Sequence, residues 1–491
     1  MVIKTLGAKP FVIQDKLHKF ESINQRHMKK FILLLTAGLI MMTSCAVNDD
    51  YGYEIKDGVI VYNTPERPAD QISMIGFAAE PLETVRIGVI GLGMRGPDAV
   101  NRFANIDGTE IVAICDLYPE KLERTQQILD RNGRARAAEY SGPDGWKELC
   151  DRDDLDLVYI VTPWDSHTPM AVYAMEQGKH VAIEVPAATS VDECWQLVNT
   201  AEKTQKHCMM LENCVYDFFE LTTLNMAQQG VFGEIIHTEG AYIHNLDPYW
   251  RAYQDNWRYE FNKKNRGDVY PTHGLGPACW ALDIHRGDKM NTLISMDTDA
   301  FNGKKLAGTY GETEYENGDH TITLIRTEKG KTIEIQHNVV TPRPYNRMYM
   351  VEGTEGFASK YPYAGYSIRT LGRDDISVDF LDGLDGESFV SRRIMEDIER
   401  EYHHPILSED SLVETAKRVG GHGGMDFIMD YRLIYCLQRG LPLDQDVYDA
   451  AEWSCLGELS RVSIENGSMP VQMPDFTRGD WNKLDGLKLA L

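Results

Sequence analysis

The chain has 491 residues, which is long enough for two domains with separate hydrophobic cores. Hydrophobic residues make up 43% and charged residues 25% of the sequence, proportions that are ordinary for a globular protein. The formal net charge is −25, and no stretch combines basic residues with interleaved aromatic residues. These features exclude nucleic-acid-binding proteins, which present a basic surface to the phosphate backbone.

A short apolar segment precedes the globular part of the chain. From Met28 the sequence reads MKKFILLLTAGLIMMTSC, with two lysines, an apolar run and small residues before Cys45. The run is short for a membrane-spanning helix, and its layout is typical of an export signal. The residues before Cys45 resemble a bacterial lipoprotein processing site, at which the cysteine becomes lipidated.

We therefore expect residues 1–45 to be a leader with a lipoprotein-type signal, whose true start is Met28. Cys45 would carry a lipid anchor and hold the protein in the bacterial cell envelope, on the periplasmic or the surface face. A cleaved signal with an incidental cysteine is the alternative. Residues 46–84 are polar and weakly periodic, and we expect them to form a tether.

The strongest motif follows this tether. The apolar run Val85–Ile90 reads as a buried parallel strand, and Gly91, Gly93 and Gly96 follow it with G-x-G-x-x-G spacing. These glycines permit a tight turn, close approach of a pyrophosphate and packing of the next helix on the strand. A second apolar run ends at Asp116, which would accept hydrogen bonds from the adenosine ribose. The residue after Asp116 is not an arginine, so the motif predicts NAD rather than NADP.

More strands and helices alternate beyond Asp116. The runs Leu157–Val161, His180–Ile183 and Met209–Asn213 read as buried strands, and Pro119–Arg131 and Met170–Gln177 read as helices. This alternation predicts a doubly wound parallel sheet over residues 85–215. Ligands of such sheets bind beyond the carboxyl ends of the strands, which places Trp164, His167 and Glu184 near the cofactor.

The character of the chain changes after residue 215. We expect residues 216–470 to form an α+β domain with one large, mainly antiparallel sheet, and residues 471–491 to be a C-terminal tail. The expected strands are Ile235–Ile243, Thr321–Thr327, Thr332–Val340 and Met348–Glu352, and the expected helices are Ser411–Arg439 and Val447–Arg461. The cysteines form no C-x-x-C pair and the pair His403–His404 has no companions at ligand spacing, so no metal site is expected.

The segment ending at Pro186, YIVTPWDSHTPMAVYAMEQGKHVAIEVP, resembles the Gfo/Idh/MocA oxidoreductase family. That family shows a strand, Pro-x-x-x-His, a helix, Gly-Lys-His-Val and Glu-Lys-Pro. The resemblance covers about residues 85–460 and implies an NAD-binding Rossmann domain followed by a substrate domain with an antiparallel sheet. It also implies that a homo-oligomer is to be expected.

One departure from the family pattern narrows the resemblance. Glu-Lys-Pro is Glu184-Val185-Pro186 here, so the lysine that ordinarily handles a substrate hydroxyl proton is missing. Together with Asn-Trp-Arg-Tyr and Tyr-Pro-Thr-His-Gly, this resembles glycoside hydrolase family 109, a branch represented by NAD-dependent α-N-acetylgalactosaminidases. The resemblance implies a redox-neutral cycle on a glycan that carries N-acetylgalactosamine. The third sugar carbon is oxidised, the hydrogen on the second is removed, the leaving group is eliminated, water adds, and the ketone is reduced.

The sequence suggests roles for individual residues in this cycle. His273 is the first choice for acid/base catalysis because an imidazole with a pKa near 6.5 suits proton transfer at neutral pH, and Tyr270 would assist it. The resemblance implies that Tyr242, Arg258 and Tyr345, with Tyr270 and His273, bind the sugar. The cofactor residues, from the motif and from the resemblance together, are Gly91, Gly93, Met94, Arg95, Gly96, Asp116, Trp164, His167, Glu184, Val185 and Asn213.

Simpler roles stay open for several of these residues. His273 and His167 would be helix caps, Tyr242 a core residue, and Arg258 the partner of Glu260. The alternative functions are an NAD-dependent sugar or inositol dehydrogenase, and a non-catalytic glycan-binding protein.

Overall fold

The computed structural model of this chain describes residues 52–376 and 378–491. The expected leader, its start at Met28 and the lipidation site Cys45 lie outside these residues. No helix within the described ranges is long and apolar enough to cross a membrane. All eight cysteines in the described part of the chain are buried and unpaired by disulfides.

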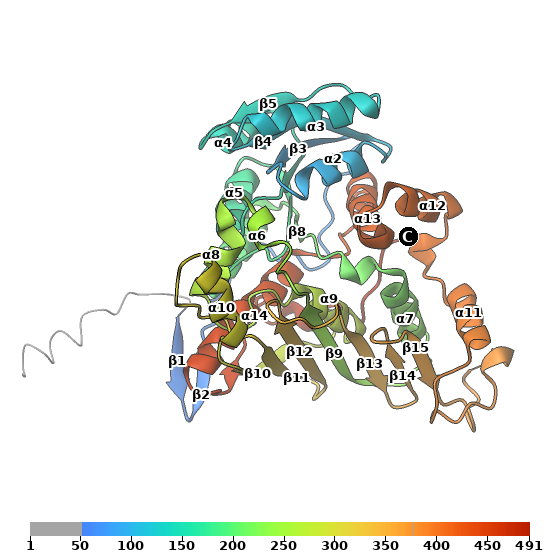
Figure 1. Cartoon of the computed structure of the whole chain (residues 1–491). Coiled ribbons are helices and arrows are strands. Elements are labelled where there is room, and N and C mark those ends of the chain that lie inside the picture. The colour runs from blue at the N-terminus through green and yellow to red at the C-terminus, as the bar shows by residue number, and fades with distance from the viewer. Residues whose placement is uncertain (1–51, 377) are drawn as a thin grey trace, which may run out of the picture. The chain divides into compact units, whose positions relative to one another are not determined.

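The first of two sheets is fully parallel and has six strands in the order β5-β4-β3-β6-β7-β8 (Figure 1). It confirms the predicted Rossmann-type fold. Its strands are β3 (Val85–Ile90), β4 (Thr109–Asp116), β5 (Ala138–Ser141), β6 (Leu157–Ile160), β7 (His180–Ile183) and β8 (Cys208–Met210). Its helices are α2 (Gly96–Phe103), α3 (Glu120–Arg131), α4 (Gly145–Cys150), α5 (His167–Glu176) and α6 (Val191–Thr204). The strand order reverses at β3, between β4 and β6, and such a reversal opens a ligand crevice at the carboxyl ends of the strands.

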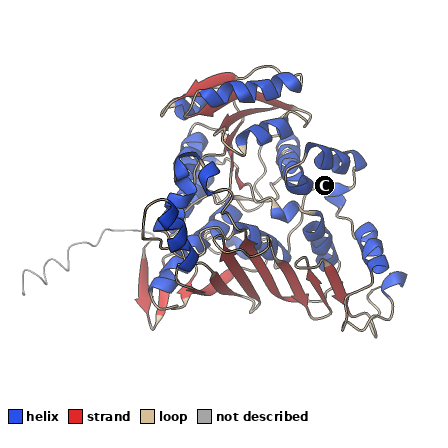
Figure 2. Ribbon diagram, viewed as in Figure 1, coloured by secondary structure: helices blue, strands red, loops and turns tan. Residues whose placement is uncertain are grey.

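The second sheet has ten strands in the order β1-β2-β16-β10-β11-β12-β9-β13-β14-β15 (Figure 2). It is antiparallel except at the β12–β9 and β16–β2 pairs, as the predicted α+β domain requires. Its strands are β1 (Tyr53–Lys56), β2 (Val59–Tyr62), β9 (Ile235–Ile243), β10 (Met290–Asp297), β11 (Thr321–Thr327), β12 (Thr332–Asn338), β13 (Tyr349–Gly353), β14 (Gly356–Ser359), β15 (Gly365–Ile368) and β16 (Val471–Gln472).

Burial along β11 alternates strictly, as expected for a strand with one face on the core. The helices of this part of the chain are α7 (Phe218–Gln228), α8 (Trp257–Lys264), α9 (Thr272–Ala281), α10 (Phe301–Thr309), α11 (Arg392–Glu401), α12 (Asp410–Val419), α13 (Met425–Arg439) and α14 (Val447–Glu465). Among them, α9 packs on β9 and α14 packs on β10. The buried face of the sheet therefore carries the helix that begins within the predicted Tyr-Pro-Thr-His motif, at Thr272.

Two segments at the ends of the chain differ from the sequence expectation. Residues 53–62, expected to belong to a tether, form the β1–β2 hairpin, and residues 471–472, expected to belong to a tail, form β16. Val471 pairs with Ile60 on one side and with Leu293 on the other, so the two ends share one sheet edge. The Asp57-Gly58 turn of the hairpin is a local signal that the tether interpretation missed, whereas the pairing of β2 with the distant β16 has no local signature.

The expected helix Ser411–Arg439 is two helices. Residues 420–424, with the sequence GGHGG, separate α12 from α13, and all five have positive φ angles between 46° and 116°. A right-handed helix cannot include such residues, and four glycines make them accessible. The apolar periodicity on both sides hid this break. We call residues 420–424 the glycine loop.

Candidate active site

A cavity of about 810 Å³ lies beyond the carboxyl ends of the parallel strands. Residues of both domains line it, which is the usual position for a ligand in this architecture. The lining includes predicted cofactor residues on one side, namely Gly91, Gly93, Met94, Arg95, Asp116, Trp164, His167, Glu184 and Val185. Predicted substrate residues Arg258 and Tyr270 line the other side.

The glycine motif after β3 fits a dinucleotide. A Cβ atom on Gly91 would lie 2.5 Å from the carbonyl oxygen of Val161, and one on Gly96 would lie 2.0 Å from that of Gly91. Side chains at these two positions would therefore disrupt the turn and the packing of α2. A Cβ on Gly93 would meet nothing within 4 Å, so this backbone faces open space in the cavity. Helix α2 begins at Gly96, directly after this turn, and the free N–H groups at the start of a helix suit an anionic pyrophosphate.

Asp116 ends β4 with its side chain buried. Its carboxylate accepts hydrogen bonds from the backbone N–H groups of Leu92, at 2.7 Å, and Tyr118, at 2.9 Å. Lys121 approaches the same carboxylate at 3.5 Å. These contacts fix the carboxylate at the edge of the cavity, with lone pairs remaining for a ribose.

Asp116→Ala is expected to weaken NAD binding by roughly tenfold or more, because hydrogen bonds to a charged group are lost. Isothermal titration with NAD of protein first stripped of its bound cofactor measures this directly, and the thermal midpoint of the stripped protein checks that the turn at Leu92 survives. Asp153→Ala, which removes an exposed aspartate, is the matched control. An unchanged Kd for the Asp116 variant would contradict the ribose contact.

Two predicted cofactor residues are placed differently from the rest. His167 is completely buried in the wall of the cavity, and its ring nitrogens lie 2.8 Å from the carbonyl oxygen of Pro186 and 2.7 Å from that of Thr162. It therefore joins the loops that follow β6 and β7. Asn213 is not part of the cavity lining; its side-chain amide donates to Asp426.

Arg258 lies buried in an aromatic cluster at the substrate side of the cavity. Its guanidinium lies 4.7 Å from the ring centre of Tyr270 and 5.8 Å from that of Tyr242. It also donates to the Tyr253 hydroxyl at 2.7 Å. Its simpler expected partner, Glu260, is bonded to lysines instead. Aromatic faces and a planar cation form a suitable floor for a sugar ring.

The predicted residues Tyr242, Tyr270 and His273 are brought together. Ring centres of Tyr242 and Tyr270 are 4.6 Å apart, and that of His273 is 5.0 Å from Tyr270 and 5.4 Å from Tyr242. Burial keeps the pKa of Tyr270 well above its usual value, so the phenol remains a hydrogen-bond donor. Tyr345 lies farther out and is 42% exposed, with its ring against His244.

The position of His273 depends on two glycines. A Cβ on Gly274 would lie 2.5 Å from the backbone nitrogen of Ala241, and one on Gly240 would lie 2.3 Å from the carbonyl oxygen of Gly274. Only glycines allow α9 to lie this close to β9. This contact brings the first turn of α9, with His273, against the inner face of the sheet beside Tyr242.

His273 is paired with Glu212, which follows β8. Its Nδ1 lies 2.8 Å from one Glu212 carboxylate oxygen and 2.9 Å from the other. Burial lowers the pKa of His273 to about 4; Glu212 opposes this shift, and the charges of Arg347 and His422 add to it. The imidazole is therefore neutral at neutral pH, donates from Nδ1 to Glu212, and leaves Nε2 as a base. The ordinary pKa near 6.5 expected for His273 from the sequence is therefore wrong, because burial lowers it.

The atoms of Glu212, Cys214 and His273 that can ligate a metal lie within 4.8 Å of one another. Here both carboxylate oxygens of Glu212 are already engaged by Nδ1 of His273. This arrangement is that of a hydrogen-bonded carboxylate–histidine pair.

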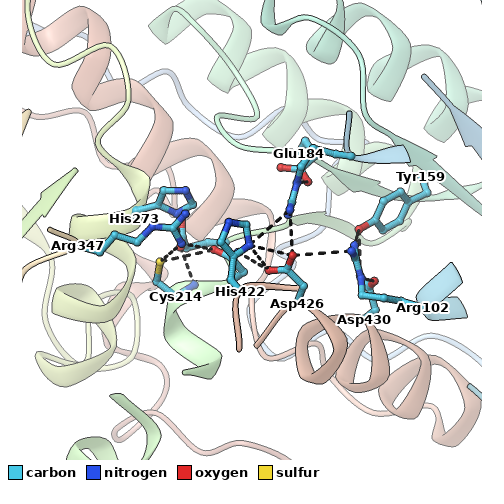
Figure 3. Close-up of polar contacts among 12 residues, drawn as sticks. Arg102, Tyr159, Glu184, Cys214, His273, Arg347, His422, Asp426 and Asp430 are labelled. Carbon is cyan, nitrogen blue, oxygen red and sulfur yellow. Dashed lines mark hydrogen bonds and ion pairs between the residues drawn. The ribbon is translucent and has the colours of Figure 1, made fainter. Parts of the chain in front are cut away.

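His422 in the glycine loop is a second histidine near this pair (Figure 3). Its Nδ1 lies 3.0 Å from a carboxylate oxygen of Asp426, which is fully buried at the start of α13. Asp426 also accepts from Arg95 at 3.0 Å, and Arg95 binds Glu184 at 3.1 Å. In Figure 3, His273 lies on one side of His422, while Asp426 and Glu184 lie on the other. This network links the glycine loop to the cofactor side of the cavity.

Sequence reasoning missed five residues of this region: Glu212, His244, Arg347, His422 and Asp426. His244 lies 3.0 Å from the Tyr242 hydroxyl, and Arg347 donates to the Cys214 sulfur at 3.2 Å. Only His422 had a visible local pattern, since a histidine between pairs of glycines is unusual in a helical context. The others are recognised only from contacts between distant segments.

The fold and the cavity define a two-domain protein that binds NAD in a Rossmann-type domain and presents a second, sheet-based domain beside it. Residues 85–212 match the family model "Oxidoreductase family, NAD-binding Rossmann fold", and residues 216–483 match "Glycosyl hydrolase 109, C-terminal domain". The chain belongs to glycosyl hydrolase family 109, as its motifs indicated, and is a glycoside hydrolase with an NAD-binding domain.

Curated relatives support this membership over nearly the whole chain. Glycosyl hydrolase family 109 protein 1 of Bacteroides thetaiotaomicron is 58% identical over 94% of this chain and 99% of its own length. The glycosyl hydrolase family 109 protein of Porphyromonas gingivalis is 57% identical, with the same coverage.

Solved structures share the fold at low sequence identity. Levoglucosan dehydrogenase in complex with NADH superposes with a TM-score of 0.59 at 16% identity, covering 80% of this chain and 100% of that one. The apo scyllo-inositol dehydrogenase of Lactobacillus casei gives a TM-score of 0.55 at 14% identity, covering 80% of this chain and 99% of that one.

Proposed function

We propose that this hydrolase releases N-acetylgalactosamine from glycans by the redox-neutral cycle described above, with NAD retained between turnovers. The observation that carries the proposal is the neutral, Glu212-bound His273, grouped with Tyr242 and Tyr270 beside an NAD-binding cavity. The position at which dehydrogenases of this fold carry a lysine is Val185, which cannot transfer a proton. A hydrolytic route that uses other proton carriers fits this site better than a plain dehydrogenase does.

The chain supplies binding and proton transfer in this proposal. When bound, NAD supplies the reversible oxidation of a sugar carbon, which acidifies the neighbouring C–H bond. The Nε2 lone pair of His273 removes that hydrogen as a proton, and Glu212 stabilises the resulting imidazolium. The protonated Tyr270 donates to a sugar hydroxyl or orients it. Arg258 and Tyr242 hold the sugar between the aromatic rings and the guanidinium fork.

Elimination also needs a proton for the departing glycosidic oxygen. The low pKa of His273 makes it a poor source, because its charged form is scarce until it has taken a proton itself. His422 is better placed to supply this proton, because Asp426 fixes its Nδ1 and the His422 side chain is 38% exposed. We propose that His422 donates this proton and later recovers it from the water that adds.

The first experiment tests cofactor and reaction together. The purified chain is desalted without added cofactor, one portion is heat-denatured to quantify released NAD, and another is assayed with nitrophenyl N-acetyl-α-galactosaminide. We expect close to one NAD per chain and nitrophenol release without added cofactor. Bound NAD with turnover only of free sugars, coupled to NADH formation, would instead indicate a dehydrogenase. No NAD and no turnover would indicate a glycan-binding protein.

A further inference from the structure

One segment of the second domain crosses to the nucleotide-binding domain at the cavity. We call residues 252–257 the strap; they lead into α8, whose first residue is Trp257, and include the short 3-10 turn Gln254–Asn256. Five strap residues line the same cavity as the glycine motif and Asp116. In Figure 1 the strap's continuation, α8, lies between the two sheets below α5. The strap therefore forms a wall of the NAD site that comes from outside the Rossmann domain.

The strap is fastened to the nucleotide-binding domain beside Asp116. The Tyr118 hydroxyl donates a hydrogen bond to the Asp255 carboxylate. The backbone N–H of Tyr118 donates to Asp116 at 2.9 Å, and Lys121 lies over the Tyr118 ring at 4.8 Å. The fastening point is thus continuous with the carboxylate expected to bind the adenosine ribose.

The other end of the strap is fixed by aromatic packing. The Tyr253 hydroxyl accepts from Arg258 at 2.7 Å, and the Trp257 ring packs edge-on against Trp164 with centres 5.1 Å apart. Between these anchors, Asp255 and Asn256 both have a φ of 54°. Two successive non-glycine residues in the left-handed region are unfavourable, and such a conformation persists only where surrounding contacts hold it. The contacts that hold it here are those with Tyr118 and Trp164.

We propose that the strap is a gate over the dinucleotide, held shut by the hydrogen bond between Tyr118 and Asp255. The gate sets how fast NAD enters and leaves, because Tyr118 and Asp255 both line the cavity in which the cofactor binds and their hydrogen bond joins two walls of it. A reaction that regenerates its NAD in each turnover benefits when bound NAD exchanges slowly with free NAD. The inference therefore rests on the proposed function and deepens it. Its test measures NAD exchange alone, so it stands or fails independently of the hydrolase assay.

The test compares Tyr118→Phe, Asp255→Asn and the double variant with the unmodified chain. Stopped-flow fluorescence of NADH mixed with protein stripped of its bound NAD gives the association rate, and chase of the NADH complex with excess NAD gives the dissociation rate. Each single variant is expected to raise both rates by about three- to tenfold, the scale of one lost hydrogen bond to a carboxylate. The Kd should change by less than about twofold, because a gate alters both rates together. The double variant should match the singles, since all three break the same bond.

Tyr363→Phe, at an 81% exposed tyrosine, is the matched control and should leave both rates unchanged. Asp255 is exposed and Tyr118 half-buried, so thermal midpoints should stay at the wild-type value. A rise in the dissociation rate alone would overturn the proposal, because it would show a direct cofactor contact rather than a gate. Unchanged rates, or additive effects in the double variant, would overturn it as well.

Discussion

His273→Ala is expected to reduce turnover of an N-acetylgalactosaminide by at least about a hundredfold while the content of bound NAD stays at the wild-type level. Loss of a positioned general base usually costs this much or more. His273 lies outside the cavity lining formed by the glycine motif, so cofactor binding does not depend on it. Steady-state kinetics and NAD release from the denatured variant measure the two quantities. Near-normal turnover would refute the assignment of the base.

Glu212→Gln complements His273→Ala, because it keeps the size of the Glu212 side chain and removes its charge. We expect kcat to fall by about tenfold with little change in KM, since Glu212 contacts the imidazole and not the sugar. The pH profile gives a second readout. The neutral form of His273 is the active one, so wild-type activity should fall as the pH drops through about 4. Glu212 raises this pKa, so the acid limb of the variant should move to lower pH.

His422→Ala is expected to lose activity in proportion to how poorly the leaving group departs. A disaccharide releases an alkoxide that needs a proton, whereas nitrophenolate leaves readily without one. We expect at least about a hundredfold loss on a disaccharide and less than about tenfold on the nitrophenyl glycoside, because general-acid catalysis contributes on this scale. Exchange of the hydrogen on the second sugar carbon, followed by NMR in deuterated water, should continue in this variant and fail in His273→Ala.

His237→Ala provides a matched control, since His237 lies on β9 with partners Thr332 and Glu239, away from the glycine loop. Equal losses on both substrates would contradict the acid role of His422 and indicate that the loop only shapes the site. Measuring NAD content separates that result from a loss of the cofactor through Arg95 and Asp426.

The nucleotide-binding half could be predicted because its information is local. Gly91 and Gly96 are required by contacts with the neighbouring strand and the adjoining turn, Gly93 leaves the backbone open to the cavity, and Asp116 follows at a fixed distance along one β-α-β unit. The sugar side could be predicted only as a set of candidates. Glu212 and His273 are 61 residues apart, and nothing in either local sequence indicates the pairing. The ordinary pKa expected for His273 was wrong for the same reason. The segments that bury its imidazole are distant in the chain, and the local sequence does not show that they pack against it.

Two local expectations failed where chain geometry overrides hydrophobic pattern. The apolar spacing is helical on both sides of residues 420–424, yet the positive φ angles at Gly420 and Gly424 exclude a continuous helix. The polar stretch before Val85 looked like a tether because β1 and β2 are only four residues long. Strand β2 pairs with β16, which its own sequence does not indicate, whereas the Asp57-Gly58 turn that joins β1 to β2 is a local hairpin signal that the tether interpretation missed.

The shared edge of the ten-stranded sheet has a consequence for the biosynthesis of this protein. Strand β16 joins β2 to β10 but follows every other strand of both sheets in the chain. The β1–β2 hairpin must therefore wait until Gln472 has been made for its partner, whereas the six parallel strands are complete by Met210. The nucleotide-binding domain can fold while the chain is being made, and the ten-stranded sheet closes only later. Shortening either end of the chain should consequently open the same edge.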